Sequence, residues 1–234
     1  MATVVLVRHG RSTANTGGVL AGRTPGVDLD ETGREQARLA AERLAPVPVA
    51  RIVSSPLERC RQTAEALVAA QPQVTVDIEP GLLECDYGDW SGRTISDLLK
   101  EPLWKTVQHQ PSAAGFPGGE TLSAMMARAV AAVRRIDAEV EASHGESAVW
   151  VAVSHGDIIK AILADALGMH LDLFQRLHVD PASMSIIRHT RRHPFVLAQN
   201  THAGDLGWLT PPAGAEAGEA PSGDAVVGGG AGPA

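Results

Sequence analysis

Two histidines lie in matching surroundings, far apart in the sequence. Residues 5–10 and 151–156 both read Val-x-Val-x-His-Gly, so His9 and His155 each follow a short apolar segment and precede a glycine. A histidine side chain can act as a nucleophile, transfer a proton or hold an anion. The glycine allows the backbone to turn sharply and to approach a ligand closely. If the two apolar segments are neighbouring strands, both rings meet at one edge of a sheet.

Two arginines could supply the positive charge of such a site. Arg8 directly precedes His9. Arg59 lies two residues beyond Leu57, about 200° around a helix from it, and so cannot join the apolar stripe of that helix. A cation in the first turn of a helix is mildly unfavourable, because the helix dipole is positive at that end. The placement is reasonable if the cation and the helix N-terminus both bind an anion. Together with the histidines, these groups favour a pocket for a dianionic phosphoryl group.

Three apolar segments lead into these polar residues and are expected to be strands. They are Val4–Val7, before Arg8-His9-Gly10-Arg11-Ser12; Ile52-Val53, before Ser54-Ser55-Pro56; and Ala148–Val153, before Ser154-His155-Gly156-Asp157. Continuous β-branched segments are typical of parallel strands covered on both faces, and ligands bind beyond the carboxyl ends of such strands. Two later segments, Met184–Ile187 and Phe195–Ala198, are expected to be edge strands.

Helical patterns follow the strands. We expect one helix to begin with Ser55 as its N-cap, Pro56 as its first residue and Glu58 completing a capping box. Its apolar stripe contains Leu57, Cys60, Ala64, Leu67 and Val68. A longer helix is expected from about Glu120 to His144-Gly145, with Leu122, Met125, Ala129, Val133, Ile136 and Val140 on one face; a third helix points Ile158, Ile159, Ile162, Leu163 and Ala166 inward. This alternation predicts a three-layer α/β/α sandwich with a mostly parallel central sheet.

Four segments resemble the motifs of the histidine phosphatase superfamily, which has the phosphoglycerate mutase-like fold. They are Leu6–Gly10 with Ser12 and Asn15; Ser54–Ala64; Glu84 with Tyr87–Gly92; and Ser154–Gly156. They occur in the family's order and extend over about two-thirds of the chain. One Arg-His-Gly tripeptide would be a weak signal, whereas four ordered matches are a strong one.

The resemblance implies a role for each residue. His9 is the expected nucleophile, forming a phosphohistidine while its other ring nitrogen donates to a backbone carbonyl. Glu84 is the expected general acid and base, with a pKa raised by an apolar loop that contains Leu83, Tyr87 and Trp90. The residues implied to bind the phosphoryl oxygens are Arg8, Asn15, Arg59 and His155. No metal ion and no cofactor is implied.

The chain departs from the family pattern at two places. Arg11 follows His-Gly where many members have Glu, and Ala21–Pro25, which includes Arg23, lacks the Gln that members often place before the glycine. Both arginines add positive charge near the mouth of the site or are solvated. The departures bear on the choice of substrate rather than on the chemistry.

Three functions are compatible with these motifs. The first is hydrolysis of a small phosphorylated metabolite. The alternative is a phosphoglycerate-type phosphomutase, but the basic residues of segment 93–119 are only Arg93, Lys100 and Lys105, without the arginine pair of the mutases. The second alternative is a non-catalytic protein that binds phosphorylated ligands, which the presence of His9, Glu84 and His155 together disfavours.

Composition narrows the class of protein. The 234 residues are 44% apolar with a net charge of −7, which suits a packed core and disfavours nucleic acid as a partner. No apolar segment approaches the roughly 18 residues of a membrane span. Residues 1–210 are expected to be the catalytic domain, and residues 211–234, of which 18 are Gly, Ala or Pro, a disordered tail. With two cysteines and no evident signal peptide, we expect a cytoplasmic protein, and a homo-oligomer is compatible with the sequence.

Overall fold

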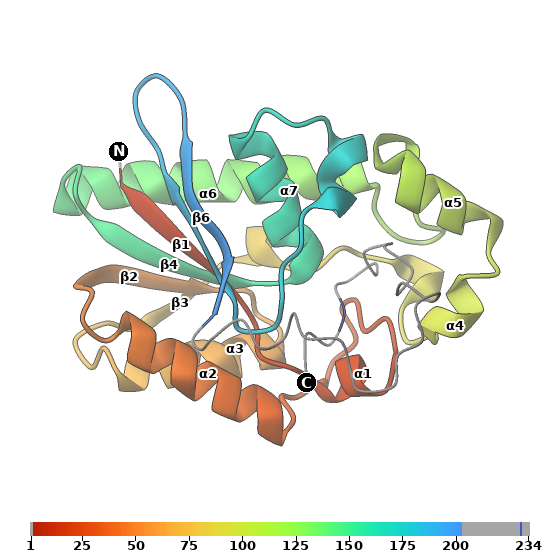
Figure 1. Cartoon of the computed structure of the whole chain (residues 1–234), viewed down its shortest axis with the longest axis horizontal. Coiled ribbons are helices and arrows are strands. Elements are labelled where there is room, and N and C mark those ends of the chain that lie inside the picture. Colours follow the sequence, from red (N-terminus) through yellow and green to blue (C-terminus); the bar gives the residue numbers. More distant parts are fainter. Residues whose placement is uncertain (1, 203–229, 231–234) are drawn as a thin grey trace, which may run out of the picture.

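A six-stranded sheet organises the described residues, with helices on both of its faces (Figure 1). The computed structural model describes residues 2–202 and residue 230. The predicted boundary at residue 210 and the predicted tail lie outside the described residues, apart from Gly230. The strands are β1 (Thr3–Arg8), β2 (Val49–Ser54), β3 (Val76–Ile78), β4 (Val149–Ser154), β5 (Met184–Arg188) and β6 (Phe195–Thr201). The helices are α1 (Thr13–Thr16), α2 (Glu31–Leu44), α3 (Glu58–Ala69), α4 (Ile95–Leu98), α5 (Pro102–His109), α6 (Leu122–His144) and α7 (Gly156–Ala166), with 3-10 helices η1 (Pro80–Leu82), η2 (Gly88–Trp90), η3 (Pro111–Ala113) and η4 (Leu171–Arg176).

The strand order is β3-β2-β4-β1-β5-β6. The first four strands in this order are parallel, while β5 runs antiparallel to β1 and β6 antiparallel to β5. The predicted α/β/α sandwich is confirmed, with a mixed sheet. The edge position predicted for Met184–Ile187 is wrong: β5 lies between β1 and β6, and Ile187 is fully buried. The edge position predicted for Phe195–Ala198 is confirmed.

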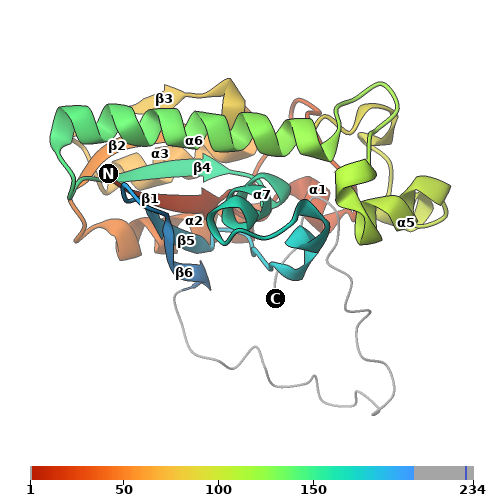
Figure 2. The same cartoon turned by 90° about the horizontal axis from the view of Figure 1, so that it is seen from above.

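The two faces of the sheet bury alternate residues of each strand, as the pleat requires. On β1, Val4 and Leu6 pack into the core beneath α6 and α7, whereas Val5 and Val7 pack toward α2 and α3. Figure 2 shows α6 and α7 on the side of the sheet opposite α2. Because both faces are covered, β1 is apolar from Val4 to Val7 and β4 from Val149 to Val153, and this explains the continuous segments in the sequence.

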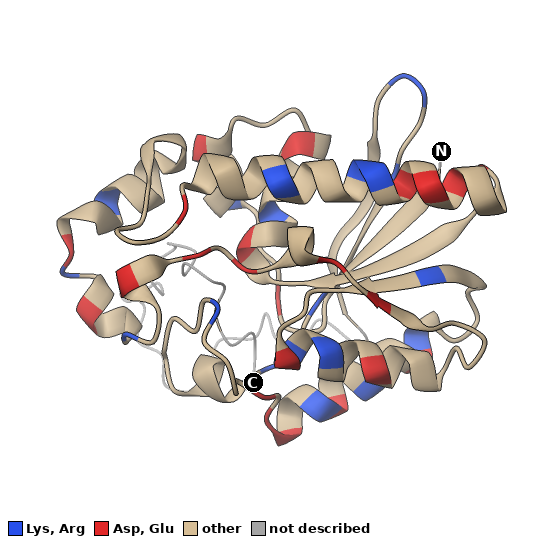
Figure 3. Ribbon diagram, turned by 180° about the vertical axis from the view of Figure 1, so that it is seen from behind, with Lys and Arg blue, Asp and Glu red and all other residues tan. Residues whose placement is uncertain are grey.

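Helix α6 has the extent predicted for the longest helix. Thr121 caps it, accepting a hydrogen bond from the backbone N–H of Ala124, and Gly145 ends it with a φ of 88°. All six residues predicted for its inner face are buried. Its outer face carries charges of both signs, as do α2 and α3 (Figure 3). Within the described residues, no helix has the length and apolarity needed to cross a membrane.

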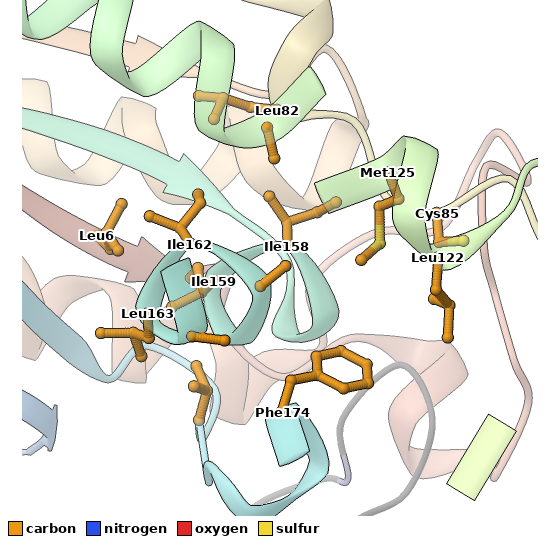
Figure 4. Packing of buried hydrophobic residues seen from close by; sticks show 14 of the residues in the cluster. Leu6, Leu82, Cys85, Leu122, Met125, Ile158, Ile159, Ile162, Leu163 and Phe174 are labelled. Atoms are coloured by element: carbon orange, nitrogen blue, oxygen red, sulfur yellow. The ribbon is translucent and has the colours of Figure 1, made fainter. Parts of the chain in front are cut away.

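Helix α7 is buried along almost its whole length. Its residues Ile158, Ile159, Ile162 and Leu163 are at most 3% exposed and pack with Leu6 of β1 and with Phe174 of η4 (Figure 4). Only Ala166 of the predicted inner residues is partly exposed. The helix begins directly after His155, so its packing fixes the position of that ring.

A long excursion, residues 83–121, lies beyond the carboxyl ends of the strands and contains α4 and α5 (Figure 1). Four of the eight Phe, Trp and Tyr residues of the chain lie here: Trp90 stacks on Trp104 at 6.0 Å between ring centroids, and Phe116 contacts Trp90 and Tyr87 edge-on. Gly88 has a φ of 50°, and a Cβ there would collide with the carbonyl oxygen of Pro117. This packing holds the loop that carries Glu84.

Candidate active site

The two histidines meet because β1 and β4 are neighbouring parallel strands. The register pairs Val5 with Val151, so the two Val-x-Val-x-His-Gly segments lie side by side, as predicted. The ring centroids of His9 and His155 are 5.3 Å apart, with the rings inclined at 63°. Both side chains are buried. Two strand ends therefore form the centre of the site.

The glycine that follows His9 allows a close approach of a helix. A Cβ on Gly10 would collide with the carbonyl oxygen of Gly33 in α2. A Cβ on Gly33 would in turn collide with the carbonyl oxygen of Arg11. Both glycines are needed to bring α2 against the end of β1.

The hydrogen bonds of His9 determine its tautomer. Its Nδ1 lies 2.7 Å from the carbonyl oxygen of Gly10, which can only accept, so Nδ1 carries the proton, as predicted. Its Nε2 accepts a hydrogen bond from Nε of Arg59 at 3.2 Å. Burial, followed by the charges of Arg59 and Arg8, holds the pKa of His9 well below 6.5. His9 is therefore neutral near pH 7, with a lone pair on Nε2.

Arg59 extends from the first turn of α3 into the site, away from the apolar stripe of that helix. Its NH2 donates to the carbonyl oxygen of Gly22 at 2.9 Å and to Nδ1 of His155 at 3.2 Å. Its NH1 is buried and has no hydrogen-bond partner among the described residues. A buried, unpaired guanidinium nitrogen beside a nucleophilic lone pair favours an anionic ligand at this point.

His155 is held in the opposite tautomer. Since the guanidinium of Arg59 can only donate, Nδ1 of His155 accepts, and Nε2 carries the proton that it donates to Oγ of Ser55 at 2.8 Å. The Sγ atom of Cys60 lies 3.4 Å from the same Nε2. Burial, followed by the charge of Arg59, lowers the pKa of His155 well below 6.5.

The predicted N-cap and capping box of α3 are wrong. The helix begins at Glu58, its N-cap is Leu57, and no side chain caps it. The backbone N–H of Ser55 instead donates to the carbonyl oxygen of Val153, which extends the pairing of β2 with β4. The hydroxyl of Ser55 is thereby placed beside His155. Glu58 turns outward and accepts from the backbone N–H of Gly26.

Arg8 is fully buried at the end of β1. Its NH1 donates to the carbonyl oxygen of Val179 at 2.8 Å. Burial lowers its pKa to about 10, against the opposing charges of Glu84 and Asp180. Arg8 therefore keeps its positive charge at neutral pH, next to His9 in the sequence and inside the same site.

Glu84 approaches the histidines from the excursion. Its Oε2 lies 3.9 Å from Nδ1 of His155, and its Oε1 accepts from the backbone N–H of Cys85 at 3.0 Å. Burial raises the pKa of Glu84 to about 7, with the charge of Asp157 as the second cause and Arg59 opposing. The raised pKa agrees with the expectation from the sequence. The carboxylate of Asp157 contributes to it in addition to burial in the apolar loop.

Two arginines hold the backbone of the Glu84 loop. Nε of Arg23 and NH2 of Arg128 both donate to the carbonyl oxygen of Glu84, at 2.9 and 3.0 Å. Both arginines also pair with Oε1 of Glu120, at 2.9 and 2.6 Å. Arg128 was not predicted from the sequence, where it is one of several arginines along α6.

The positive charge expected near the mouth from Arg11 and Arg23 is neutralised. Nε of Arg11 lies 2.7 Å from Oδ2 of Asp30. Arg23 is paired with Glu120 and, at 3.3 Å, with Asp86. Neither arginine is a free surface cation.

Asn15 stands apart from the other predicted residues. Its Oδ1 accepts from the backbone N–H and the hydroxyl of Ser12, at 3.0 and 2.8 Å, in the capping box of α1. Within the described residues, no hydrogen bond joins it to the remaining predicted side chains. The structure thus brings together Arg8, His9, Arg59, Glu84 and His155, and leaves Asn15 at the start of α1.

Among the described residues, no group of three or more His, Cys, Asp or Glu side chains is arranged to hold a metal ion.

Comparison with known proteins assigns a family. The model of the histidine phosphatase superfamily (branch 1) matches residues 4–202. Phosphoserine phosphatase 1 of Hydrogenobacter thermophilus is 32% identical over 214 residues, which cover 88% of this chain and 96% of that protein. Probable phosphoglycerate mutase GpmB of Photorhabdus laumondii is 31% identical over 218 residues, which cover 91% of this chain and 97% of that protein.

A solved structure has the same fold. The mycobacterial glucosyl-3-phosphoglycerate phosphatase in complex with VO3 is 28% identical, with a TM-score of 0.75, covering 85% of this chain and 99% of that one. The predicted fold and the predicted family are both confirmed.

Proposed function

This chain belongs to the histidine phosphatase superfamily, and from that premise we propose that it hydrolyses a phosphomonoester of a small metabolite through a phosphohistidine on His9. The observation that carries the proposal is the neutral His9, whose Nε2 lone pair faces the guanidinium of Arg59. A nucleophile and a cation for the phosphoryl oxygens are thus already aligned.

The first half-reaction transfers the phosphoryl group to the protein. The Nε–H of Arg59 moves its hydrogen bond from Nε2 of His9 to a phosphoryl oxygen, and the freed Nε2 lone pair attacks phosphorus as the bond from phosphorus to the ester oxygen breaks. Glu84, whose pKa of about 7 leaves it partly protonated at neutral pH, gives its proton to the departing oxygen. The alcohol leaves, and His9 is left as a phosphohistidine.

The second half-reaction releases phosphate. The carboxylate of Glu84 takes a proton from water, whose oxygen attacks phosphorus as the bond to Nε2 breaks. Inorganic phosphate leaves, and His9 and Glu84 return to their initial states. Arg8 and Arg59 hold the phosphoryl oxygens in both steps. His155 joins them when its Nδ1, which accepts from Arg59 in the free protein, is protonated beside the dianionic group. The arginines supply the positive charge, so the reaction as proposed uses no metal ion.

Hydrolysis is favoured over mutase activity because cations around the site are already paired with carboxylates. A mutase has to retain a second anionic group of the substrate. In segment 93–119, Arg93 pairs with Glu101 at 2.6 Å and Lys100 with Asp97 at 2.9 Å. Arg11 and Arg23 are also neutralised. The similarity to a protein named as a mutase keeps this activity as the alternative.

Non-catalytic binding is the less favoured alternative. Binding of phosphate alone requires cations but no lone pair and no proton donor. Here His9 is held in the tautomer of a nucleophile and Glu84 has the raised pKa of an acid. These two features are explained by turnover and not by binding.

The experiment is a panel of phosphorylated metabolites, assayed with the wild type and with His9→Ala. Release of inorganic phosphate by the wild type and none by the variant supports the proposal. An isomerised phosphate ester with little free phosphate, stimulated by a bisphosphate, indicates the mutase. Binding of the esters by folded protein without turnover indicates the binding protein.

A further inference from the structure

A row of buried polar side chains connects the Glu84 loop to helix α7 and takes no part in the reaction proposed above. The hydroxyl of Tyr87 donates to Oδ2 of Asp157 at 2.7 Å. Nζ of Lys160 lies 3.5 Å from Oδ1 of Asp157 and donates to Oε1 of Gln175 at 3.1 Å. Tyr87, Asp157 and Lys160 are at most 2% exposed. Because a buried ion pair adds little net stability compared with apolar residues, a role beyond packing has to be considered.

The surroundings make this polar row conspicuous. Asp157 and Lys160 lie on α7, whose other inner residues are isoleucine, leucine and alanine (Figure 4). The ring of Phe174 lies 5.8 Å from Nζ of Lys160. Burial lowers the pKa of Lys160, and the charge of Asp157 opposes that shift. The pair thus lies inside an apolar region, on the helix that begins directly after His155.

The hydrogen bond from Tyr87 to Asp157 joins the two segments that carry Glu84 and His155. Tyr87 is three residues after Glu84, and Asp157 is two residues after His155. The carboxylate of Glu84 accepts one hydrogen bond from the described residues, that from the backbone N–H of Cys85. Its direction therefore depends on the loop and on the charges around it.

Holding the loop backbone does not by itself require this hydrogen bond. Arg23 and Arg128 already bind the carbonyl oxygen of Glu84, and the loop packs tightly at Gly88. What the arginines do not supply is a negative charge near the Glu84 carboxyl. Asp157 supplies it from the first turn of α7, two residues after His155, whose Nδ1 lies 3.9 Å from Oε2 of Glu84. A carboxylic acid near a carboxylate is held in its protonated form.

The titratable groups around Asp157 come from several elements. The charged ones are Lys160 on its own helix, Arg8 at the end of β1 and the carboxyl of Glu84 on the loop; Tyr87 and Cys85 of the same loop are neutral, because burial raises the pKa of each. Asp157 raises the pKa of Glu84, whereas Arg59 and Arg8 lower it. Lys160 is attracted by both carboxylates, so its charge offsets part of the effect of Asp157.

We propose that Asp157 is a positioning residue that keeps Glu84 protonated until the ester oxygen departs, with Tyr87 fixing the Asp157 carboxylate and Lys160 limiting its effect. This inference rests on the proposed function, in which Glu84 is the proton donor. After Glu84 has given up its proton, its carboxylate lies in the field of Asp157. That field favours the return of a proton from the attacking water, so one residue assists both half-reactions.

The test compares the pH dependence of kcat/KM for an alkyl phosphomonoester in the wild type, Asp157→Asn and Lys160→Met. Asp157→Asn keeps an acceptor for Tyr87 and removes the charge. We expect the alkaline limb of its kcat/KM profile to shift to a pH about one unit lower. The kcat/KM of this variant then falls roughly tenfold on the alkaline side and is unchanged on the acid side. Lys160→Met is expected to move the limb upward. An aryl phosphate with a good leaving group is expected to show a smaller change.

Asp137→Asn is the matched control, because Asp137 is also fully buried but lies on α6, where it accepts from the indole N–H of Trp150 at 3.0 Å. Its limb is expected to coincide with that of the wild type. Thermal unfolding checks that each variant folds. If Asp157→Asn does not fold, Tyr87→Phe replaces it, with an expected fall of about tenfold in kcat for the alkyl ester and no change in KM.

The outcomes separate this inference from the proposed function. If the wild type is active and its alkaline limb coincides with that of Asp157→Asn, the inference alone is overturned. The inference is also overturned if the alkaline limbs of Asp157→Asn and Lys160→Met shift equally in the same direction. If Tyr87→Phe is the variant used, kinetics equal to those of the wild type overturn it. A wild type that releases no phosphate from any ester overturns the proposed function, and the inference with it.

Discussion

Nε of Arg59 donates a hydrogen bond to Nε2 of His9 at 3.2 Å. The cation thus faces the one ring nitrogen that can attack phosphorus, while Gly10 holds the other nitrogen as a donor. NH1 of Arg59 has no hydrogen-bond partner in the described part of the chain, and it is placed to bind a phosphoryl group while that group is attacked. Arg59 therefore binds the phosphoryl group at the position from which His9 attacks it.

Replacement of Arg59 by lysine is expected to disable this arrangement. A lysine cannot reach His9, His155 and a phosphoryl group together, because it lacks the planar fork of donors. We expect Arg59→Lys to lower kcat/KM by about 10²–10³-fold with an unchanged fold. Steady-state kinetics measures this, with Arg61→Lys as the control on an exposed position of the same helix. Activity within twofold of the wild type would contradict the assigned role.

The activity of the wild type is expected to fall as the pH rises through about 7. Burial and Asp157 raise the pKa of Glu84 to about 7, so the acid form is present below that pH and is lost above it. His9 stays neutral well below pH 6.5, which places the acid limb lower. Glu84→Gln is expected to lose about 10²–10⁴-fold on an alkyl ester. The kcat/KM profile checks both statements, and a wild-type limb that persists unchanged in Glu84→Gln contradicts the assignment.

Ser55→Ala is expected to affect both stability and rate. It leaves the buried Nε2–H of His155 without its acceptor, and this is expected to lower the free energy of unfolding by about 1–3 kcal/mol. The freed ring is expected to lower kcat about tenfold. Ser54→Ala is the control, because among the described residues the buried hydroxyl of Ser54 bonds only to a backbone carbonyl. Equal effects of the two substitutions would argue against a special role for Ser55.

Stability is expected to decline in mild acid. The pKa values of His9 and His155 are lowered in the folded protein, so their contribution is full above pH 6.5 and is lost as the pH falls below it. Glu84 acts oppositely, because its raised pKa adds stability as the pH falls from about 7 toward 4.5. The net loss is about 1.4 kcal/mol per pH unit at most, and about twice that in Glu84→Gln. Urea denaturation at pH 5.5 and 7.5 measures it; equal slopes in both proteins would contradict the opposing effect of Glu84.

The sequence predicted the centre of the site because the same pattern occurs at two strand ends. The repeated Val-x-Val-x-His-Gly segments imply a parallel register, and the structure has that register. The position of Arg59 followed from helical geometry. Such features are local, or are repeated locally, and so can be read from one chain.

The parts that were missed depend on partners distant in the sequence. The hydroxyl of Ser55 has the pattern of an N-cap but bonds to His155, one hundred positions away. Asp157 receives its hydrogen bond from Tyr87, seventy positions away. The one local signal of that contact was a charged pair, Asp157 and Lys160, in the first half of a helix whose other residues there are apolar. The interior position of β5 likewise depends on its pairing with β1.

The central claim is the covalent phosphohistidine on His9, and rapid quenching with a substrate that carries a radioactive phosphoryl group tests it most directly. The wild type is expected to show protein-bound label in a burst approaching one phosphoryl group per chain, stable to base and labile to acid. His9→Ala, folded to the same extent, is expected to show none. A wild type that releases phosphate without ever carrying label, or an equally labelled His9→Ala, would contradict the proposed mechanism.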